Sequence, residues 1–326
     1  MVISTLLDVL GLFGLAIILI ILSAALAPFE TMGWWAGWFG DKIYDEPIPS
    51  DGLLRKVDTD SNCYILFLSG VGRTSTLTLS FREKSFLERM ARRLPNAVVI
   101  DDVFPYSVNN LSLTKQPYFA RFWQKALKWK MRGPRFAGNL INMRNIFQVL
   151  ISADKRYGPM YNQGIAEVLL NGLNRYDFDP NGNTPIFLVA SSGAAQIAVG
   201  ASHYLKGWVN VPLYIVSVGG VFGSEPGLLT ADHTFHFYGE RDTAVRWSFL
   251  DAGRWPFNSG SFWNQARRQG RITTVNLGDF CHTGRGSYLD FKGKLSDGRS
   301  PVDVTADTVS EVIQQAVKTS PPAYST

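Results

Sequence analysis

Three residues of the sequence have side chains suited to acyl transfer: Ser192, Asp242 and His282. A serine hydroxyl is a weak nucleophile at neutral pH and needs a base within hydrogen-bond reach. A histidine ring is such a base, and a carboxylate fixes its tautomer and stabilises its positive form. We therefore take Ser192 as the candidate nucleophile, His282 as the base and Asp242 as the orienting acid.

The elements that position these residues can be inferred from six short apolar runs, none of which contains a charged residue. Such runs are typical of strands buried on both faces. Their alternation with helical patterns predicts an α/β fold, with a mostly parallel sheet and helices on both faces. The expected strands are 63–68, 97–100, 185–189, 213–218, 234–238 and 272–277, and helices are expected at 80–94, within 116–173, at 193–205 and at 305–317.

Functional side chains gather at the carboxyl ends of strands in such sheets. Ser192, Asp242 and His282 follow the third, fifth and sixth expected strands. A single histidine is more often structural than catalytic, but His282 is the only one of four that lies in a loop beyond a strand end. The other three, which fall within a helix or on a strand, are His203, His233 and His236.

The candidate nucleophile lies in the segment 190–194, which reads ASSGA between a strand and a helix. A tight strand-to-helix turn admits only small residues beside its central residue. The apolar run ends at Val189, which puts Ser192 rather than Ser191 at the centre. An ordinary turn of small residues would have the same sequence, and an aspartate such as Asp242 also commonly caps a helix.

The order of these motifs resembles that of serine hydrolases of the α/β-hydrolase fold family, in which serine, acid and histidine follow successive strands. The resemblance covers about residues 61–318 and points to no subfamily. It implies acyl transfer to Ser192, with His282 as base and then as acid, on an ester, thioester or amide. The membrane location expected below suggests a lipid-derived substrate. No cofactor or metal is expected. The alternative is a catalytically inactive fold of this kind that acts as a membrane scaffold.

Acyl transfer also needs donors for the negative oxygen of the tetrahedral intermediate. The resemblance implies the backbone N–H of Gly193, directly after the nucleophile, and that of Val71 in the loop after the first strand. That loop reads Ser69-Gly-Val-Gly. Ser69 stands where the family often has histidine.

A membrane anchor is expected at 9–29, which has no charged residue and about the length that spans a bilayer. Trp34, Trp35 and Trp38 follow, as in the aromatic belt of a membrane interface. A cleaved signal peptide is the alternative, but no Lys or Arg precedes the apolar run. The basic residues after the run favour a single-pass protein with its catalytic domain on the cytoplasmic side.

The segment from Val103 to Ala153 contains no Asp or Glu but eight Lys and Arg, interleaved with aromatic residues. Such a segment can lie on anionic lipid headgroups, through Lys125, Lys128 and Lys130. An ordinary solvated face is the alternative. Nucleic acid is not an expected partner, since it fits this composition but not the anchor.

The composition fits a single enzyme domain with an added segment. The 326 residues are 46% hydrophobic, the formal charge is +5, and the two cysteines exclude a disulfide-dense scaffold. The expected organisation is a tail 1–8, an anchor 9–29, an interfacial segment and linker 30–60, a hydrolase domain 61–318 with a basic insert at about 103–153, and a disordered tail 319–326.

Overall fold

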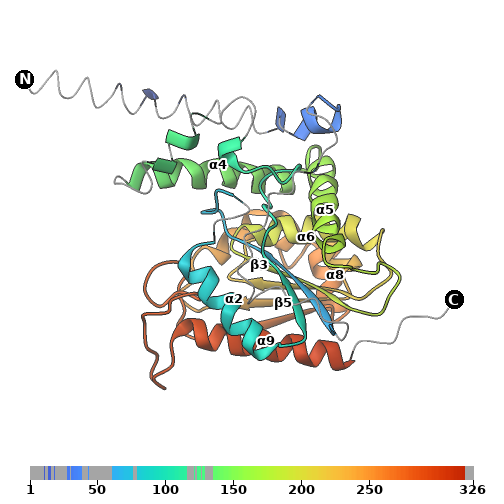
Figure 1. Cartoon of the computed structure of the whole chain (residues 1–326), viewed down its shortest axis with the longest axis vertical. Coiled ribbons are helices and arrows are strands. Elements are labelled where there is room, and N and C mark those ends of the chain that lie inside the picture. Colours follow the sequence, from blue (N-terminus) through green and yellow to red (C-terminus); the bar gives the residue numbers. More distant parts are fainter. Residues whose placement is uncertain are drawn as a thin grey trace, which may run out of the picture.

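The centre of the protein is a six-stranded, all-parallel sheet with the strand order β2-β1-β3-β4-β5-β6 (Figure 1). The computed structural model of the chain describes residues 61–75, 79–115 and 135–319, together with 31–38 and single positions within 11–29, at 43 and within 121–128. The strands are β1 Cys63–Leu68, β2 Ala97–Ile100, β3 Ile186–Ser191, β4 Leu213–Val218, β5 His233–Tyr238 and β6 Ile272–Asn276. All six expected strands are therefore present.

Helices cover both faces of this sheet. The α-helices of the described ranges are α2 Phe81–Arg93, α4 Arg135–Ala153, α5 Gly158–Asn174, α6 Ala194–Lys206, α7 Gly227–Thr230, α8 Phe262–Arg268 and α9 Pro301–Thr319. The 3₁₀ helices are η1 Leu113–Lys115, η2 Val245–Leu250 and η3 Ala252–Arg254. The α/β architecture expected from the sequence is thus confirmed.

The side chains of each strand alternate between two hydrophobic cores, as the pleat requires. In β1, Ile65 and Phe67 join a core with α2 and α9, whereas Leu66 and Leu68 join a larger core with α5 and α6. Every residue of β1 is buried, so the strand has no polar face. This explains why the sequence shows an unbroken apolar run there instead of an alternating pattern.

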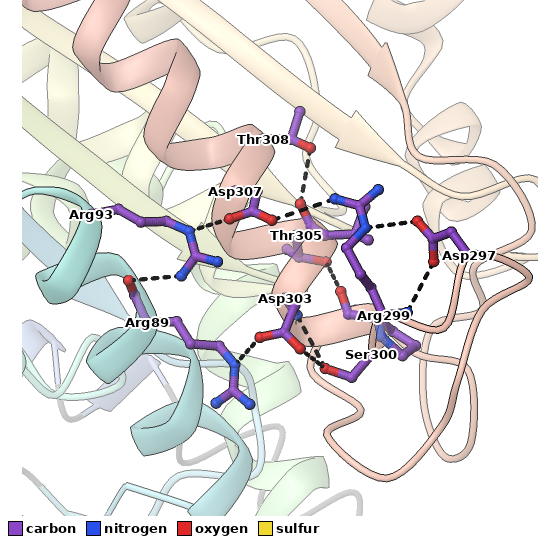
Figure 2. A network of polar contacts seen from close by, with 11 residues as sticks. Arg89, Arg93, Asp297, Arg299, Ser300, Asp303, Thr305, Asp307 and Thr308 are labelled. Carbon is purple, nitrogen blue, oxygen red and sulfur yellow. Dashed lines mark hydrogen bonds and ion pairs between the residues drawn. The ribbon is translucent and has the colours of Figure 1, made fainter.

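An ion-pair network links α2 to α9 on one face of the sheet (Figure 2). Arg89 pairs with Asp303, and Arg93 pairs with Asp307. Arg299 also contacts Asp307, across 3.5 Å. These side chains are partly exposed, and such pairs contribute only about 0–1 kcal/mol each. The buried apolar contact between the two helices therefore contributes more to stability than the pairs do.

The expected helical region 116–173 includes α4 and α5, with further helical positions at 121, 123–125, 127 and 128, and most of 116–134 lies outside the described residues. The chain turns between the helices at Asp154, whose Oδ1 accepts the backbone N–H groups of Arg156 and Tyr157. Pro159 then occupies the first turn of α5, where its missing N–H is not needed.

The expected anchor, 9–29, lies mostly outside the described residues, as does the expected C-terminal tail beyond 319. Within the described part of the chain, no helix has the length and apolar character needed to cross a bilayer. Thr31 is fully buried, and the ring of Trp34 lies against α5 at Gly164. The expected linker therefore begins with residues that pack on the domain.

Two of the lysines expected at a lipid surface, Lys125 and Lys128, are exposed, while Lys130 lies outside the described residues. Arg144 from the same insert is buried. Its guanidinium donates to the carbonyl of Tyr106 and to Oδ1 of Asn145. Part of the basic insert is thus an internal support for the domain.

Candidate active site

The turn between β3 and α6 has an unusual backbone conformation at its centre. Ser192 has φ +55°, in the left-handed region that residues with a side chain rarely adopt. The conformation costs about 1–2 kcal/mol. Three backbone bonds maintain it. The N–H of Ser192 donates to the carbonyl of Val218, and the N–H groups of Ala195 and Val221 donate to the carbonyl of Ser192. The turn places the hydroxyl of Ser192 beside His282.

The structure brings Ser192, His282 and Asp242 into one chain of hydrogen bonds. The Oγ of Ser192 lies 2.8 Å from Nε2 of His282. The Nδ1 of His282 lies 2.9 Å from Oδ2 of Asp242. The three residues follow β3, β5 and β6 and meet at the carboxyl edge of the sheet. The geometry puts a base beside the hydroxyl and a carboxylate beside the base, which is the arrangement that activates a serine.

Asp242 is a fully satisfied carboxylate. Its Oδ1 accepts the backbone N–H groups of Ala244 and Val245, at 2.9 and 3.3 Å. Burial alone would raise the pKa of Asp242, but the hydrogen bonds from His282 and Tyr288 lower it below the ordinary value of 3.8. The group is therefore negative at neutral pH and can stabilise a positive imidazole.

Tyr288 is a site residue that the sequence did not reveal. Its buried hydroxyl donates to Oδ2 of Asp242 at 2.7 Å and accepts the N–H of Gly239 at 2.8 Å. Burial and the neighbouring Asp242 charge raise the pKa of Tyr288 well above its ordinary value, so it remains a proton donor. Gly219 makes room for the ring, because a Cβ there would lie 2.3 Å from Cε2 of Tyr288.

The expected oxyanion residues, Val71 and Gly193, lie next to each other. A Cβ added to Gly193 would lie 3.1 Å from Cγ1 of Val71, and one added to Gly70 would lie 3.4 Å from Cβ of Ser192. The loop after β1 is therefore packed against the turn between β3 and α6 that contains Ser192. Neither the Val71 nor the Gly193 N–H donates to a protein acceptor within the described ranges.

Asn145 of α4 holds the loop after β1 through side-chain hydrogen bonds. Its fully buried Nδ2 donates to the carbonyl oxygens of Val71 and Arg73, at 2.7 and 2.8 Å. Both carbonyls are turned toward the asparagine, so its side chain ties two residues of the loop to α4. Sequence reasoning missed Asn145, and an uncharged polar residue within a helical pattern was the one available signal.

Ser69 connects the same loop to α2. Its hydroxyl donates to Oε1 of Glu83, and its carbonyl accepts the hydroxyl of Tyr106 at 2.9 Å. The second oxygen of Glu83 accepts the N–H of Ser80, which caps α2. A serine–glutamate link therefore supports the loop at the position where the resemblance suggested a histidine.

The other histidines lie away from this hydrogen-bond chain. His236 is buried against Ser217, with Nδ1 3.1 Å from the hydroxyl, and burial and Arg254 lower its pKa to about 3. It is therefore neutral at physiological pH. His233 contacts Thr273 near the edge of the sheet. Across the described residues, no three His, Cys, Asp or Glu side chains are grouped so as to hold a metal ion.

Comparison with known proteins adds no assignment. No protein-family model matches the chain, and no curated protein is significantly similar to it in sequence. Functional inference for this protein therefore rests on the side-chain geometry at the carboxyl edge of the sheet.

Proposed function

We propose that this protein is a serine hydrolase of the α/β-hydrolase fold that transfers an acyl group to Ser192. The observation that carries the proposal is the hydrogen-bond chain from Ser192 through His282 to Asp242, at 2.8 and 2.9 Å. A buried serine, histidine and aspartate can form such a chain in a structural role, but the left-handed backbone of Ser192 argues against that role. Strain at a non-glycine residue is concentrated at functional sites.

The topology of the sheet supports the same proposal. The chain leaves β1 toward β2 on one side and returns to β3 on the other. Ligands of open α/β sheets bind outside the carboxyl ends of the strands at such a reversal. The loop with Val71 follows β1, and the turn with Ser192 follows β3, so both flank this point.

In the proposed mechanism, Nε2 of His282 takes the hydroxyl proton as Oγ of Ser192 attacks the substrate carbonyl carbon. The N–H groups of Gly193 and Val71 donate to the resulting oxyanion. His282 then gives its proton to the leaving group, and the carbonyl reforms as an acyl-enzyme. Water, deprotonated by His282, attacks that ester and releases the acid and the free serine. The substrate class is an ester, thioester or amide.

A fluorophosphonate probe tests this function directly. The full-length protein should be labelled, Ser192→Ala should not be labelled, and Ser191→Ala should be labelled at the wild-type rate. Ser191 is the matched control because it is the adjacent serine and lies outside the hydrogen-bond chain. Absence of labelling in a folded wild-type protein would contradict the proposal and favour an inactive hydrolase fold that serves as a membrane scaffold.

We also propose that residues 9–29 anchor the enzyme in a membrane as a single pass, with the catalytic domain on the cytoplasmic side. The support is the uncharged apolar stretch in the sequence. The full-length protein should remain with membranes through a carbonate wash, and removal of residues 1–29 should release it. The cut precedes Thr31 and Trp34 because both pack on the domain. A soluble full-length protein would contradict the anchor.

The exposed Lys125 and Lys128 are further proposed contacts for anionic headgroups, together with Lys130. The protein without residues 1–29 should bind anionic vesicles through these lysines, and binding should fall as salt rises. Charge reversal of the three lysines should weaken it. Equal binding to neutral vesicles would contradict this electrostatic contact.

A further inference from the structure

A second surface with unusual composition begins a few residues after Asp242. Six large apolar side chains in the range 247–262 are between 39% and 85% exposed. Single exposed apolar residues are normal, but a group of them indicates a contact surface. We call this group the aromatic surface, and its members are Trp247, Phe249, Leu250, Trp255, Phe257 and Phe262.

Hydrogen bonds and a ring contact hold the residues of the aromatic surface in place. Nε1 of Trp255 donates to the carbonyl of Phe249 at 2.8 Å, and the rings of Trp255 and Phe257 are 5.4 Å apart. Nδ2 of the buried Asn264 donates to the carbonyls of Trp255 and Asn258, at 2.8 and 2.9 Å. The protein thus uses a buried amide of α8 to hold the loop in the conformation in which these aromatic side chains face solvent.

Positive charge accompanies the exposed rings. Residues 243–270 contain four arginines and a single acidic residue, Asp251. The carboxylate of Asp251 is turned inward, where it accepts the N–H groups of Ser224 and Gly253. Three of the arginines are exposed, and within residues 243–270 no exposed carboxylate balances them. The exposed arginines are Arg246, Arg267 and Arg268.

The fourth arginine, Arg254, lies beneath the surface, where the charge of Asp251 partly offsets its own. The guanidinium of Arg254 lies 3.3 Å from the ring centre of Trp263 and 4.8 Å from that of Phe222. It is buried, and its Nη1 has no hydrogen-bond partner among the described residues. Stacking on aromatic rings stabilises a desolvated cation without neutralising its charge.

We infer that the aromatic surface docks on an anionic lipid bilayer. Tryptophan, phenylalanine and leucine insert at the boundary between headgroups and acyl chains, and arginines beside them attract anionic headgroups. Each arginine near such a surface contributes about 1 kcal/mol. A nucleic acid would meet the same charge but would not contact Leu250 or Phe257 favourably. The surface is separate from the lysines of the basic insert and does not depend on chemistry at Ser192.

A fluorophore at position 257 can report contact with acyl chains. We would replace Cys281 with serine, leave the fully buried Cys63, and label Phe257→Cys with an environment-sensitive dye. The matched control is Gln315→Cys, an exposed position on α9, which packs on the other face of the sheet. Both full-length proteins are reconstituted in phosphatidylcholine vesicles with or without about 30% phosphatidylserine, with a nitroxide on the lipid acyl chain.

The dye at 257 should shift to the blue and be quenched by the nitroxide in anionic vesicles, while the dye at 315 should be unaffected. Adding Arg246→Gln and Arg267→Gln should reduce quenching at 257 toward that of the control. Equal quenching at 257 and 315, or equal quenching in neutral vesicles, would overturn the inference. If the dye at 257 is shielded in the absence of lipid, and more so at higher protein concentration, the inference is overturned in favour of contact between copies of the chain.

Discussion

Tyr288 donates a hydrogen bond to Oδ2 of Asp242, the same carboxylate oxygen that lies beside Nδ1 of His282. The oxygen thus receives two donors from two different residues of the loop after β6. With the backbone donors to its other oxygen, Asp242 is held in one orientation. In the proposed mechanism, Tyr288 is a positioning residue that acts on His282 through the carboxylate.

Replacing Tyr288 with phenylalanine should lower the rate of fluorophosphonate labelling roughly tenfold, because a hydrogen bond to a charged group contributes about 1.5–3 kcal/mol. Tyr64→Phe is a matched control, since it also removes a buried tyrosine hydroxyl bond but lies at the opposite end of β1 from the site. Both variants should lose stability in denaturant titrations, and only Tyr288→Phe should lose labelling rate. An unchanged rate would mean that Tyr288 is purely structural.

The left-handed backbone of Ser192 gives a second prediction. Ser192→Gly should be more stable than Ser192→Ala by about 0.5–1 kcal/mol, because glycine relieves the strain at some entropic loss. Neither variant should react with the probe. Ser191 is in β3, and there the order should reverse, so that Ser191→Gly is less stable than Ser191→Ala. Urea unfolding of the four variants tests this, and the same order at both positions would contradict it.

The lowered pKa of Asp242 predicts how stability depends on pH. A carboxyl whose pKa is lower in the folded state than in the unfolded state stabilises the fold at any pH above its unfolded-state pKa, which is about 3.9 for aspartate. This stabilisation is lost as the pH falls through the folded-state pKa. The wild type should therefore exceed Asp242→Asn in unfolding free energy at pH 6, and the difference should shrink below about pH 4. Chemical denaturation at several pH values measures it. A constant difference would contradict the prediction.

Asn145→Ala should slow acyl transfer by about tenfold to a hundredfold, because removing one oxyanion donor by itself costs about 10²–10³ in rate. The variant frees the carbonyls of Val71 and Arg73, and the loop can then move away from Ser192. Asn162→Ala is the control, since it also deletes a buried amide, here bonded to Ser152 between α4 and α5. We expect both variants to lose similar amounts of stability and only Asn145→Ala to lose rate of acyl transfer. Equal rates of acyl transfer in the two variants would contradict the prediction.

The strands β1 to β4 could be predicted from the sequence because they are buried on both faces, so that each consists of one apolar run. β5 is partly buried and β6 has no fully buried residue, and these two strands were indicated by β-branched and aromatic residues between turn segments. The order of Ser192, Asp242 and His282 could be predicted because each follows such a run directly. The expected ends of β3, 185 and 189, differ from the observed ends, Ile186 and Ser191. Pro185 has no N–H to donate to the neighbouring strand, and the small residues after Val189 give no signal that the strand continues.

The segment after Asp242 could not be predicted from periodicity. The range 243–270 forms two 3₁₀ helices and the short α8, and all of its aromatic side chains except Trp263 are exposed, so no apolar face repeats at a helical or strand period. Tyr288 was missed for a different reason. Its role depends on space beside Gly219 and on the N–H of Gly239, which are far from it in the chain.

The position of β1 between β2 and β3 affects how the protein can be made. β1 pairs with β2 soon after both leave the ribosome, but its other neighbour, β3, follows roughly 120 residues later. At synthesis rates of about 5–20 residues per second, one hydrogen-bonding edge of a wholly apolar strand stays unpaired for roughly 6–24 s. Unpaired edges of this kind promote aggregation. The nascent chain therefore has a period in which that edge needs protection, for example by a chaperone.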